Sequence, residues 1–426
     1  MNDTTPQVAL PSFREALGFW LKLGFISFGG PAGQIAIMQH ELVDTRRWIG
    51  QGAFLRALNF CMLLPGPEAQ QLATYTGWRL HGIKGGLAAG ILFVLPGALL
   101  LYLLAFLAAA YGEVAPVAAV FDGLKPVVVA IVAHAVWRIG RRTLHGWVSI
   151  AVAAASFLAI SVAHIPFPLV ILAAALVGFA VSRTHPNVFA HGHNTEATES
   201  EAVASQPGAP RLLKMAAIYV VLIVLPVALI VAAVGPTPFL TIARFFTQAA
   251  FVTFGGAYAV LPYVADAAVN RFHWLDADQM INGLALAETT PGPLILVLEY
   301  VGFFAGWNAG YPTPFVAATL GAFIATYATF LPSIVMILAG APYIEQIARV
   351  KSAAAALGAI TAAVVGVILS LTVFLAKNVI VVDGKPDWLN VAVALATFGV
   401  LLKFNPRLHW LVAAGAVFGL ARMALS

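Results

Sequence analysis

Charge is scarce in this chain. Only 10% of its 426 residues are Asp, Glu, Lys or Arg, whereas 61% are hydrophobic. So little polar material cannot cover the surface of a water-soluble protein of this length, and we expect an integral membrane protein. Segments of alternating polarity about ten residues long, which a membrane β-barrel needs, are also lacking. The fold class that remains is an all-α polytopic, multi-pass membrane protein.

Cysteine is nearly absent too. The single residue, Cys61, excludes an intramolecular disulfide and a metal site built from cysteines. The sequence lacks a Ser-His-Asp arrangement, a phosphate-binding glycine loop and a cofactor fingerprint, so we expect a protein that is not an enzyme and holds neither metal nor cofactor. The net charge of +5 is spread over short loops, so we expect no nucleic-acid partner. A secretory signal pattern is missing, and the mature chain is expected to begin near Met1.

The sequence contains an internal repeat. A shift of 226 positions superimposes three motifs without a gap: Phe28-Gly29-Gly30 on Phe254-Gly255-Gly256, Trp48 on Trp274, and Pro65-Gly66-Pro67 on Pro291-Gly292-Pro293. Internal repeats in an apolar chain are typical of secondary transporters, whose substrate site lies between the repeats near the middle of the bilayer. We therefore divide the chain into a first transporter repeat (1–183), a flexible polar linker (184–211), a connecting transmembrane helix (212–235) and a second repeat (236–426).

The distribution of Lys and Arg predicts how the chain is oriented. These residues gather in alternate loops, which places the N-terminus and the central linker in the cytoplasm. The apolar run 212–234 has no counterpart before the first repeat. One additional crossing turns the second copy upside down, so we expect two inverted structural repeats.

The region that precedes the long apolar runs has an unusual form in both repeats. Residues 12–84 and 237–307 are apolar but interrupted twice, at the FGG motif and at the PGP motif. The arms between these breaks are about 13 to 17 residues long, too short to cross ~30 Å of hydrocarbon comfortably. The pattern therefore predicts re-entrant broken helical hairpins, two in each repeat.

The helix breaks are candidate anion sites. Glycine permits a turn that other residues tolerate poorly, and the proline that follows can start a new helix. A helix N-terminus offers unpaired amides and about half a positive charge, which suits an oxyanion. Four such ends near the middle of the bilayer could hold a dianion. The alternative is that these residues only break helices.

Polar residues near the breaks complete the candidate site. Arg56 and Arg79 are expected to contact the anion, although either could instead extend to the cytoplasmic face. Glu68 could cap its helix, whereas Glu288, or Glu299 on the same hairpin, could carry a proton or pair with a neighbour. Side-chain amides could orient the oxyanion or hold helices together. The candidate substrate-binding residues are Gly29, Gly30, Pro31, Gln34, Arg56, Asn59, Pro65, Gly66, Pro67, Glu68, Gln70, Arg79, Gly255, Gly256, Asn282, Glu288, Thr289, Thr290, Pro291, Gly292 and Pro293.

These motifs resemble a known family. The segments FGGPAGQIAIMQHELVDTRRWI, LLPGPEAQQLATYTGWRLHGIKGG, FGGAYAVLPYV and ETTPGPLILVLEYVGF are similar to the chromate ion transporter family in its long, two-domain form. The resemblance covers both repeats and implies a bacterial inner-membrane protein that exports chromate and confers chromate resistance, with sulfate as a structural mimic. The family's motif residues correspond here to Gly29, Gly30, Pro31, Gln34, Trp48, Pro65, Gly66, Pro67, Glu68, Gln70, Gly255, Gly256, Trp274, Pro291, Gly292 and Pro293.

Three functions stay open at the level of sequence. The first is chromate export by alternating access, with the anion held at re-entrant helix N-termini. The second is proton-coupled import of a sulfate-type oxyanion on the same scaffold, and the third is an anion channel. The expected partners are chromate or sulfate and the lipid bilayer, and the sequence leaves open whether the protein works as a monomer or a homodimer.

Overall fold

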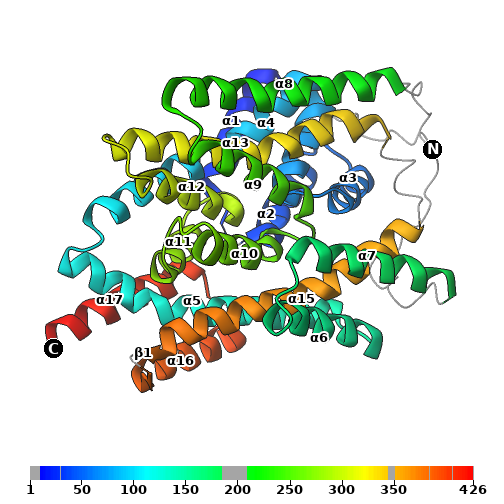
Figure 1. Ribbon diagram of the computed structural model, residues 1–426. Coiled ribbons are helices and arrows are strands. Elements are labelled where there is room, and N and C mark those ends of the chain that lie inside the picture. The colour runs from blue at the N-terminus through cyan, green and yellow to red at the C-terminus, as the bar shows by residue number, and fades with distance from the viewer. Residues whose placement is uncertain are drawn as a thin grey trace.

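The protein is built almost entirely of helices (Figure 1). The computed structural model describes residues 10–28, 30–184, 209–343, 351–382, 384–404 and 406–425. Gly29 and most of the predicted linker therefore lie outside the described residues. Six helical segments in the described part are long and apolar enough to cross a membrane: Glu68–Tyr111, Ala115–Thr143, Leu213–Val234, Pro314–Gly340, Ala354–Ile380 and Leu408–Leu425. The prediction of an all-α polytopic membrane protein is confirmed, although the sequence analysis had not singled out the last of these segments.

The first half places short helices before long ones. Its elements are α1 (Phe13–Ile26), α2 (Gly30–Gln39), the π-helical turn η1 (His40–Thr45), α3 (Gln51–Leu63), α4 (Glu68–Tyr111), α5 (Ala115–Thr143), α6 (Trp147–Ser161) and α7 (Phe167–Thr184). Ser12 caps α1, since its hydroxyl accepts a hydrogen bond from the amide of Glu15 at 3.2 Å. His81 and Gly82 have non-helical backbone angles, so α4 is bent into two helical segments.

The second half follows α8 (Ala209–Val234), the apolar helix between the halves. Its elements are α9 (Phe239–Val252), α10 (Ala257–Asp266), η2 (Ala267–Arg271), α11 (Ala277–Thr289), η3 (Leu294–Leu296), α12 (Val297–Trp307), α13 (Pro314–Gly340), η4 (Ala341–Tyr343), α15 (Lys351–Ile380), β1 (Val381–Val382), β2 (Lys385–Pro386), α16 (Trp388–Phe404) and α17 (Leu408–Leu425). The two short strands form an antiparallel hairpin in which Val381 pairs with Pro386.

The backbone repeats itself at the spacing of the sequence motifs. When α1 and α3 are shifted by 226 positions, their bounds become those of α9 and α11. Arg47 and His273, which share a motif position, both have positive φ, at 53° and 51°. The amides of Trp48 and Trp274 each donate 2.8 Å hydrogen bonds to the carbonyl six residues earlier. The inverted orientation of the halves and the re-entrant path of the hairpins stay predictions.

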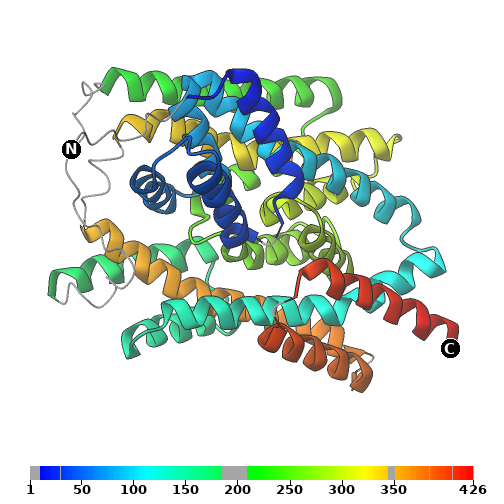
Figure 2. The ribbon, with the colours of Figure 1, turned by 180° about the vertical axis from the view of Figure 1, so that it is seen from behind.

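Two layers of long helices enclose the short broken ones (Figures 1 and 2). One layer contains α4, α8 and α13, against which the 14-residue helices α1 and α9 pack, and the other contains α5, α6, α7, α15, α16 and α17. The short helices α2, α3, α10 and α11 lie between the layers, as Figure 2 shows for α2 and α3 from behind. The breaks are therefore surrounded by protein on both sides.

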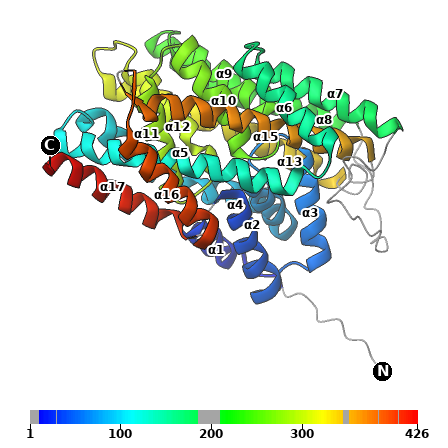
Figure 3. The same ribbon diagram turned by 90° about the horizontal axis from the view of Figure 1, so that it is seen from below.

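The two halves exchange their outer helices (Figure 3). α5 of the first half packs against α16 and α17 of the second, whereas α15 of the second half packs against α6 and α7 of the first. Small residues allow this contact, because a side chain at Gly123 on α5 would collide with the backbone of Gly415 and Gly419 on α17. Close packing of small residues is the usual way in which helices associate in membranes. The exchange ties the halves together around the breaks.

Candidate functional site

The breaks of the two halves are joined by a reciprocal pair of backbone hydrogen bonds. The amide of Gly66, in the PGP turn of the first half, donates to the carbonyl of Thr253, at the FGG break of the second half, at 2.7 Å. The amide of Gly292, in the second PGP turn, donates to the carbonyl of Ser27, at the first FGG break, at 2.8 Å. Each PGP turn thus contacts the FGG break of the opposite half. The breaks of the two halves therefore lie side by side.

Gln34 of α2 strengthens this junction. Its side-chain amide nitrogen donates to the carbonyl of Gly292 at 2.7 Å and lies 3.3 Å from the carbonyl of Ser27, and the side chain is fully buried. A Cβ on Gly256 would lie 3.8 Å from the ring of Pro31, so the two FGG motifs also face each other. Gln34 therefore fixes the backbone of the opposite half, and its own carbonyl oxygen has no hydrogen-bond partner in the described part of the chain.

Three of the four predicted helix starts open an α-helix. α2 begins at Gly30, α10 begins after Gly256, and α4 begins after Pro67, with no side-chain cap at the last two. Their first amides are available to an anion. The fourth differs from the expectation, because Pro291-Gly292-Pro293 leads into the 3₁₀ turn η3 before α12 starts. The two PGP turns are therefore not equivalent.

The two predicted arginines lie near the same tyrosine of α4. Arg56 of α3 is half-buried, and Arg79 of α4 is exposed. Both guanidinium groups lie near the hydroxyl of Tyr75, to which Arg79 hydrogen bonds. Asn59 is also half-buried on α3, and Glu68 is half-buried as the first residue of α4. The structure thus brings Arg56 and Arg79 near one aromatic hydroxyl, whereas Glu68 directly follows the first PGP turn.

The carboxylates of the second half occupy two surroundings. Tyr258 of α10 donates a 2.5 Å hydrogen bond to Glu288 of α11, and the guanidinium of Arg138 on α5 is close enough to act on both electrostatically. The sequence analysis did not connect Arg138 with Glu288. Glu299 of α12 is 6% exposed, and one of its carboxylate oxygens has no hydrogen-bond partner among the residues described.

The remaining polar candidates mostly bond within their own helices. The hydroxyls of Thr289 and Thr290 donate to the carbonyls of Leu286 and Ala287, at 2.8 and 3.3 Å. Gln70 donates to the hydroxyl of Thr74 at 3.3 Å, which leaves its carbonyl oxygen buried and without a partner within the described residues. The side-chain oxygen of Asn282 is in the same condition. Each of these unpaired acceptors needs a hydrogen-bond donor, which a dianion does not provide.

An ion-pair cluster that joins α5 to α11 was not predicted. Lys125, in the middle of α5, has a side chain that is 16% exposed and reaches Asp122 at 2.8 Å and Asp278 of α11 at 3.0 Å. It joins a long helix of the first half to a broken hairpin of the second. A lone lysine inside a long apolar run was the sequence signal that could have revealed it, because such a residue needs a partner at membrane depth.

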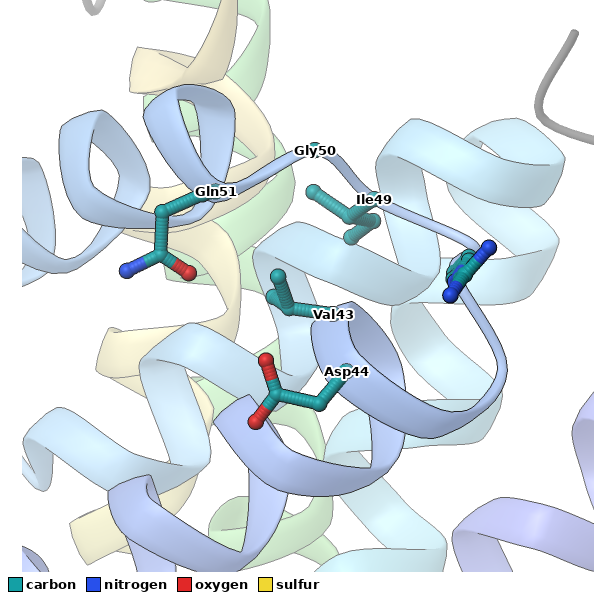
Figure 4. Close-up of a pocket in the computed structure, with 6 residues that line it drawn as sticks. Val43, Asp44, Ile49, Gly50 and Gln51 are labelled. Atoms are coloured by element: carbon teal, nitrogen blue, oxygen red, sulfur yellow. The ribbon is translucent and has the colours of Figure 1, made fainter. Parts of the chain in front are cut away.

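The cavity in Figure 4 lies away from the breaks. It has a volume of about 430 Å³ and is formed where η1 turns into α3, lined by Val43, Asp44, Arg47, Ile49, Gly50 and Gln51. None of the predicted substrate-binding residues lines it. In the described part of the chain, no three His, Cys, Asp or Glu residues are grouped as metal ligands.

Broken helices from two related halves, joined at their breaks inside a polytopic membrane protein, are the arrangement in which secondary transporters hold their substrates. The pattern of the chromate transporter family matches residues 14–179 and 240–420, so both halves are covered. The chain belongs to the chromate transporter family. No solved structure matches it.

Its relatives include proteins of full and of half length. A chromate transport protein of Pseudomonas aeruginosa is 33% identical over 88% of this chain and 84% of its own length. A chromate transport protein of Cupriavidus metallidurans is 28% identical over 95% of this chain and 92% of its own. The uncharacterized transporter YwrB of Bacillus subtilis matches only 32% of this chain but 71% of its own length, at 28% identity. All three are named as transport proteins rather than as enzymes.

Proposed function

We propose that this protein exports chromate across the bacterial inner membrane by alternating access. Two relatives that align with most of the chain are named chromate transport proteins, which supports the substrate. The observation that carries the mechanism is the reciprocal pair of hydrogen bonds, Gly66 to Thr253 and Gly292 to Ser27. A rocking motion of one half against the other would break and remake these contacts, and so would open the space between the breaks to one side at a time.

The anion is held by neutral donors in this proposal. The helices α2, α4 and α10 begin at the breaks, and helix N-termini would stabilise an oxyanion without a buried lysine. Arg56 and Arg79 would attract the anion from the cytoplasmic side toward α4. The N-terminus and the linker face the cytoplasm, and α8 inverts the second half.

Membrane potential favours export of a dianion. Moving two negative charges out of a negative interior releases roughly 2 × 2.3 kcal/mol per 100 mV. That energy corresponds to more than three decades of concentration at ~1.4 kcal/mol per decade. Export therefore needs no coupling ion.

One observation favours a second candidate, the proton-coupled import of a sulfate-type oxyanion. Uptake against the membrane potential would require a proton carrier, and the hydrogen-bonded pair of Tyr258 and Glu288 lies at the break of the second half. A carboxylate paired with a neutral hydroxyl can exchange a proton as the site opens. In the exporter, the same pair would only hold α10 to α11.

Transport into inside-out vesicles distinguishes these mechanisms. Labelled chromate and sulfate would be offered while the membrane potential and the pH gradient are clamped separately. Saturable chromate accumulation driven by an interior-positive potential, and unchanged in Glu288→Gln, is the result expected for the exporter. Dependence on the pH gradient that disappears in Glu288→Gln would instead establish proton coupling. Flux that does not saturate would identify an anion channel.

A further inference from the structure

Each long helix after a PGP motif passes the PGP turn of the opposite half. On α4, a side chain at Gly97 would collide with the carbonyl of Pro291. On α13, the hydroxyl of Ser333 occupies the place where a side chain on Gly66 would project. Gly97 and Ser333 each follow a proline within their helix, Pro96 and Pro332. The two contacts are therefore equivalent, and each half makes one of them.

The duplication does not reveal this pair in the sequence. Pro96 and Pro332 are 236 positions apart, ten more than the spacing of the other motifs. The ten additional residues lie between the second PGP motif and Pro332. An alignment without gaps sets Gly97 against Phe323 and hides its counterpart.

The two contacts differ in what they offer a ligand. Gly97 has no side chain, so α4 closes directly on the backbone of the second PGP turn. Ser333 is fully buried, and its hydroxyl has no hydrogen-bond partner among the described residues. A serine in a helix commonly bonds to the carbonyl four residues earlier. Thr329, one turn before, does so with Ala325 at 2.7 Å, whereas Ser333 turns toward Gly66 instead.

Other groups at the first PGP turn fit the same ligand. Gly66 is followed at once by the start of α4, where Pro67 provides no side-chain cap and the first amides remain available. Gln71 lies at the turn, donates to the carbonyl of Pro65 at 2.8 Å, and is fully buried. Glu68 opposes a dianion when it is ionised, so anion binding here depends on neutral donors. A hydroxyl beside unpaired amides is suited to the oxygens of a tetrahedral oxyanion.

We propose that Ser333 is a substrate-binding residue, and that the protein has one tetrahedral-oxyanion site, at the first PGP turn. The second PGP turn, closed by Gly97 and followed by a 3₁₀ turn, only supports the frame. This inference rests on the proposed function and adds to it a ligand from the second half. The binding site is then shared between the halves, so their relative motion changes the affinity directly.

Anion affinity of the purified full-length protein tests this proposal. Chromate and sulfate would be titrated in detergent by calorimetry into the wild type, Ser333→Ala and Thr329→Val. The control removes a hydroxyl that is buried on the same helix but already bonded. We expect Ser333→Ala to weaken binding about ten- to hundredfold, the effect of one hydrogen bond to a charged group, and Thr329→Val to change it less than about twofold.

A second variant keeps the test decisive if Ser333→Ala does not fold. Ser333→Cys preserves the size of the side chain but donates weakly, and it is expected to lower the affinity by a smaller factor. Wild-type affinity in a folded Ser333→Ala or Ser333→Cys protein would overturn the role of Ser333 alone. Absence of any chromate or sulfate binding in the wild type would instead overturn the proposed function, and this inference with it.

Discussion

The two halves build the same aromatic corner with a different third member. In the first half, the rings of Phe19 and Trp48 meet edge to face, with centroids 5.3 Å apart and planes at 78°. In the second half, Phe245 and Trp274 do so at 5.7 Å and 77°. A third group contacts both rings, and it is a guanidinium in the first half and a phenyl ring in the second.

The third group of the aromatic corner is charged in the first half and apolar in the second. Arg46 lies 5.1 Å from the ring of Phe19 and 5.0 Å from that of Trp48. It also pairs with Glu41 at 3.2 Å, and Glu41 in turn contacts Lys22. Phe272 takes the corresponding place in the second half, 4.6 Å from Trp274. Charged residues of the first half therefore hold its hairpin together, and charge alone does not identify substrate contacts.

The comparison of the two PGP turns predicts the largest effect. Gly66 has φ of +126° and contacts Ser333, whereas Gly292 has φ of +97° and would place a Cβ 3.0 Å from the flexible side chain of Leu296. Backbone strain of this kind costs about 1–3 kcal/mol in either variant. Gly66→Ala adds a collision at the proposed anion site, so we expect it to lower transport about tenfold more than Gly292→Ala. Vesicle transport at equal protein levels would measure this, and equal losses would refute the asymmetry of the turns.

The ion pair between the halves gives the next effect. Lys125→Met leaves Asp122 and Asp278 without their shared cation, and we expect a loss of about 1–2 kcal/mol, limited because both carboxylates remain partly solvated. Lys22→Met breaks a 3.4 Å pair on a side chain that is 55% exposed, within one half, and should cost less than about 1 kcal/mol. Thermal unfolding in detergent compares the two. A larger loss in Lys22→Met would contradict the importance of the contact between halves.

Substitutions of Arg46 test whether charge or packing holds the aromatic corner of the first half. Arg46→Phe copies the second half, so it should retain the ring packing and lose only the ion pairs, at a cost of about 1 kcal/mol or less. Arg46→Ala removes the group that packs on both rings, so this variant should be less stable than Arg46→Phe. Unfolding midpoints of the two variants decide this. If Arg46→Phe proves the less stable, then the charge rather than the packing holds the hairpin.

The smallest effect concerns pH and the last helices. Burial raises the pKa of Asp387, but hydrogen bonds from the amide of Asn390 and from Arg422 outweigh it, and the pKa lies below its usual value. The stabilisation from a lowered pKa is complete above the unfolded value of about 3.9 and is lost as pH falls through the lower folded value. Asp387→Ala should therefore cost about 1 kcal/mol at neutral pH, as for a helix cap, and less in strong acid.

The first half provides the control for that measurement. α6 is capped without charge, since the amide of Gly146 donates to the hydroxyl of Ser149 at 3.2 Å. The cost of Ser149→Ala should therefore not change between neutral and acidic pH. A pH-dependent loss in this variant, or a constant loss in Asp387→Ala, would show that the Asp387 carboxylate is not the titrating group.

Much of the frame could be predicted from the sequence. The helix breaks at the FGG and PGP motifs, the long apolar helices and the duplication were all visible, because Gly and Pro limit backbone geometry locally and apolar runs of that length have few alternatives. The residues of the candidate site stay predictions. Gln34 and Gly66 were named for an anion, and they lie at the junction between halves. Ser333 and Arg138 were not connected with Gly66 and Glu288, since each lies on a long helix far away in the sequence.

The sequence by itself determined where this chain breaks its helices and that it does so twice, since both follow from the chemistry of neighbouring residues. Only the tertiary structure decided that each PGP turn bonds to the opposite half and that α5 and α15 exchange partners. It also decided that the first PGP turn faces the hydroxyl of Ser333 and the second faces Gly97, which has no side chain. These are contacts between residues far apart in the chain, and an offset of ten positions between the copies is enough to conceal them from a local pattern.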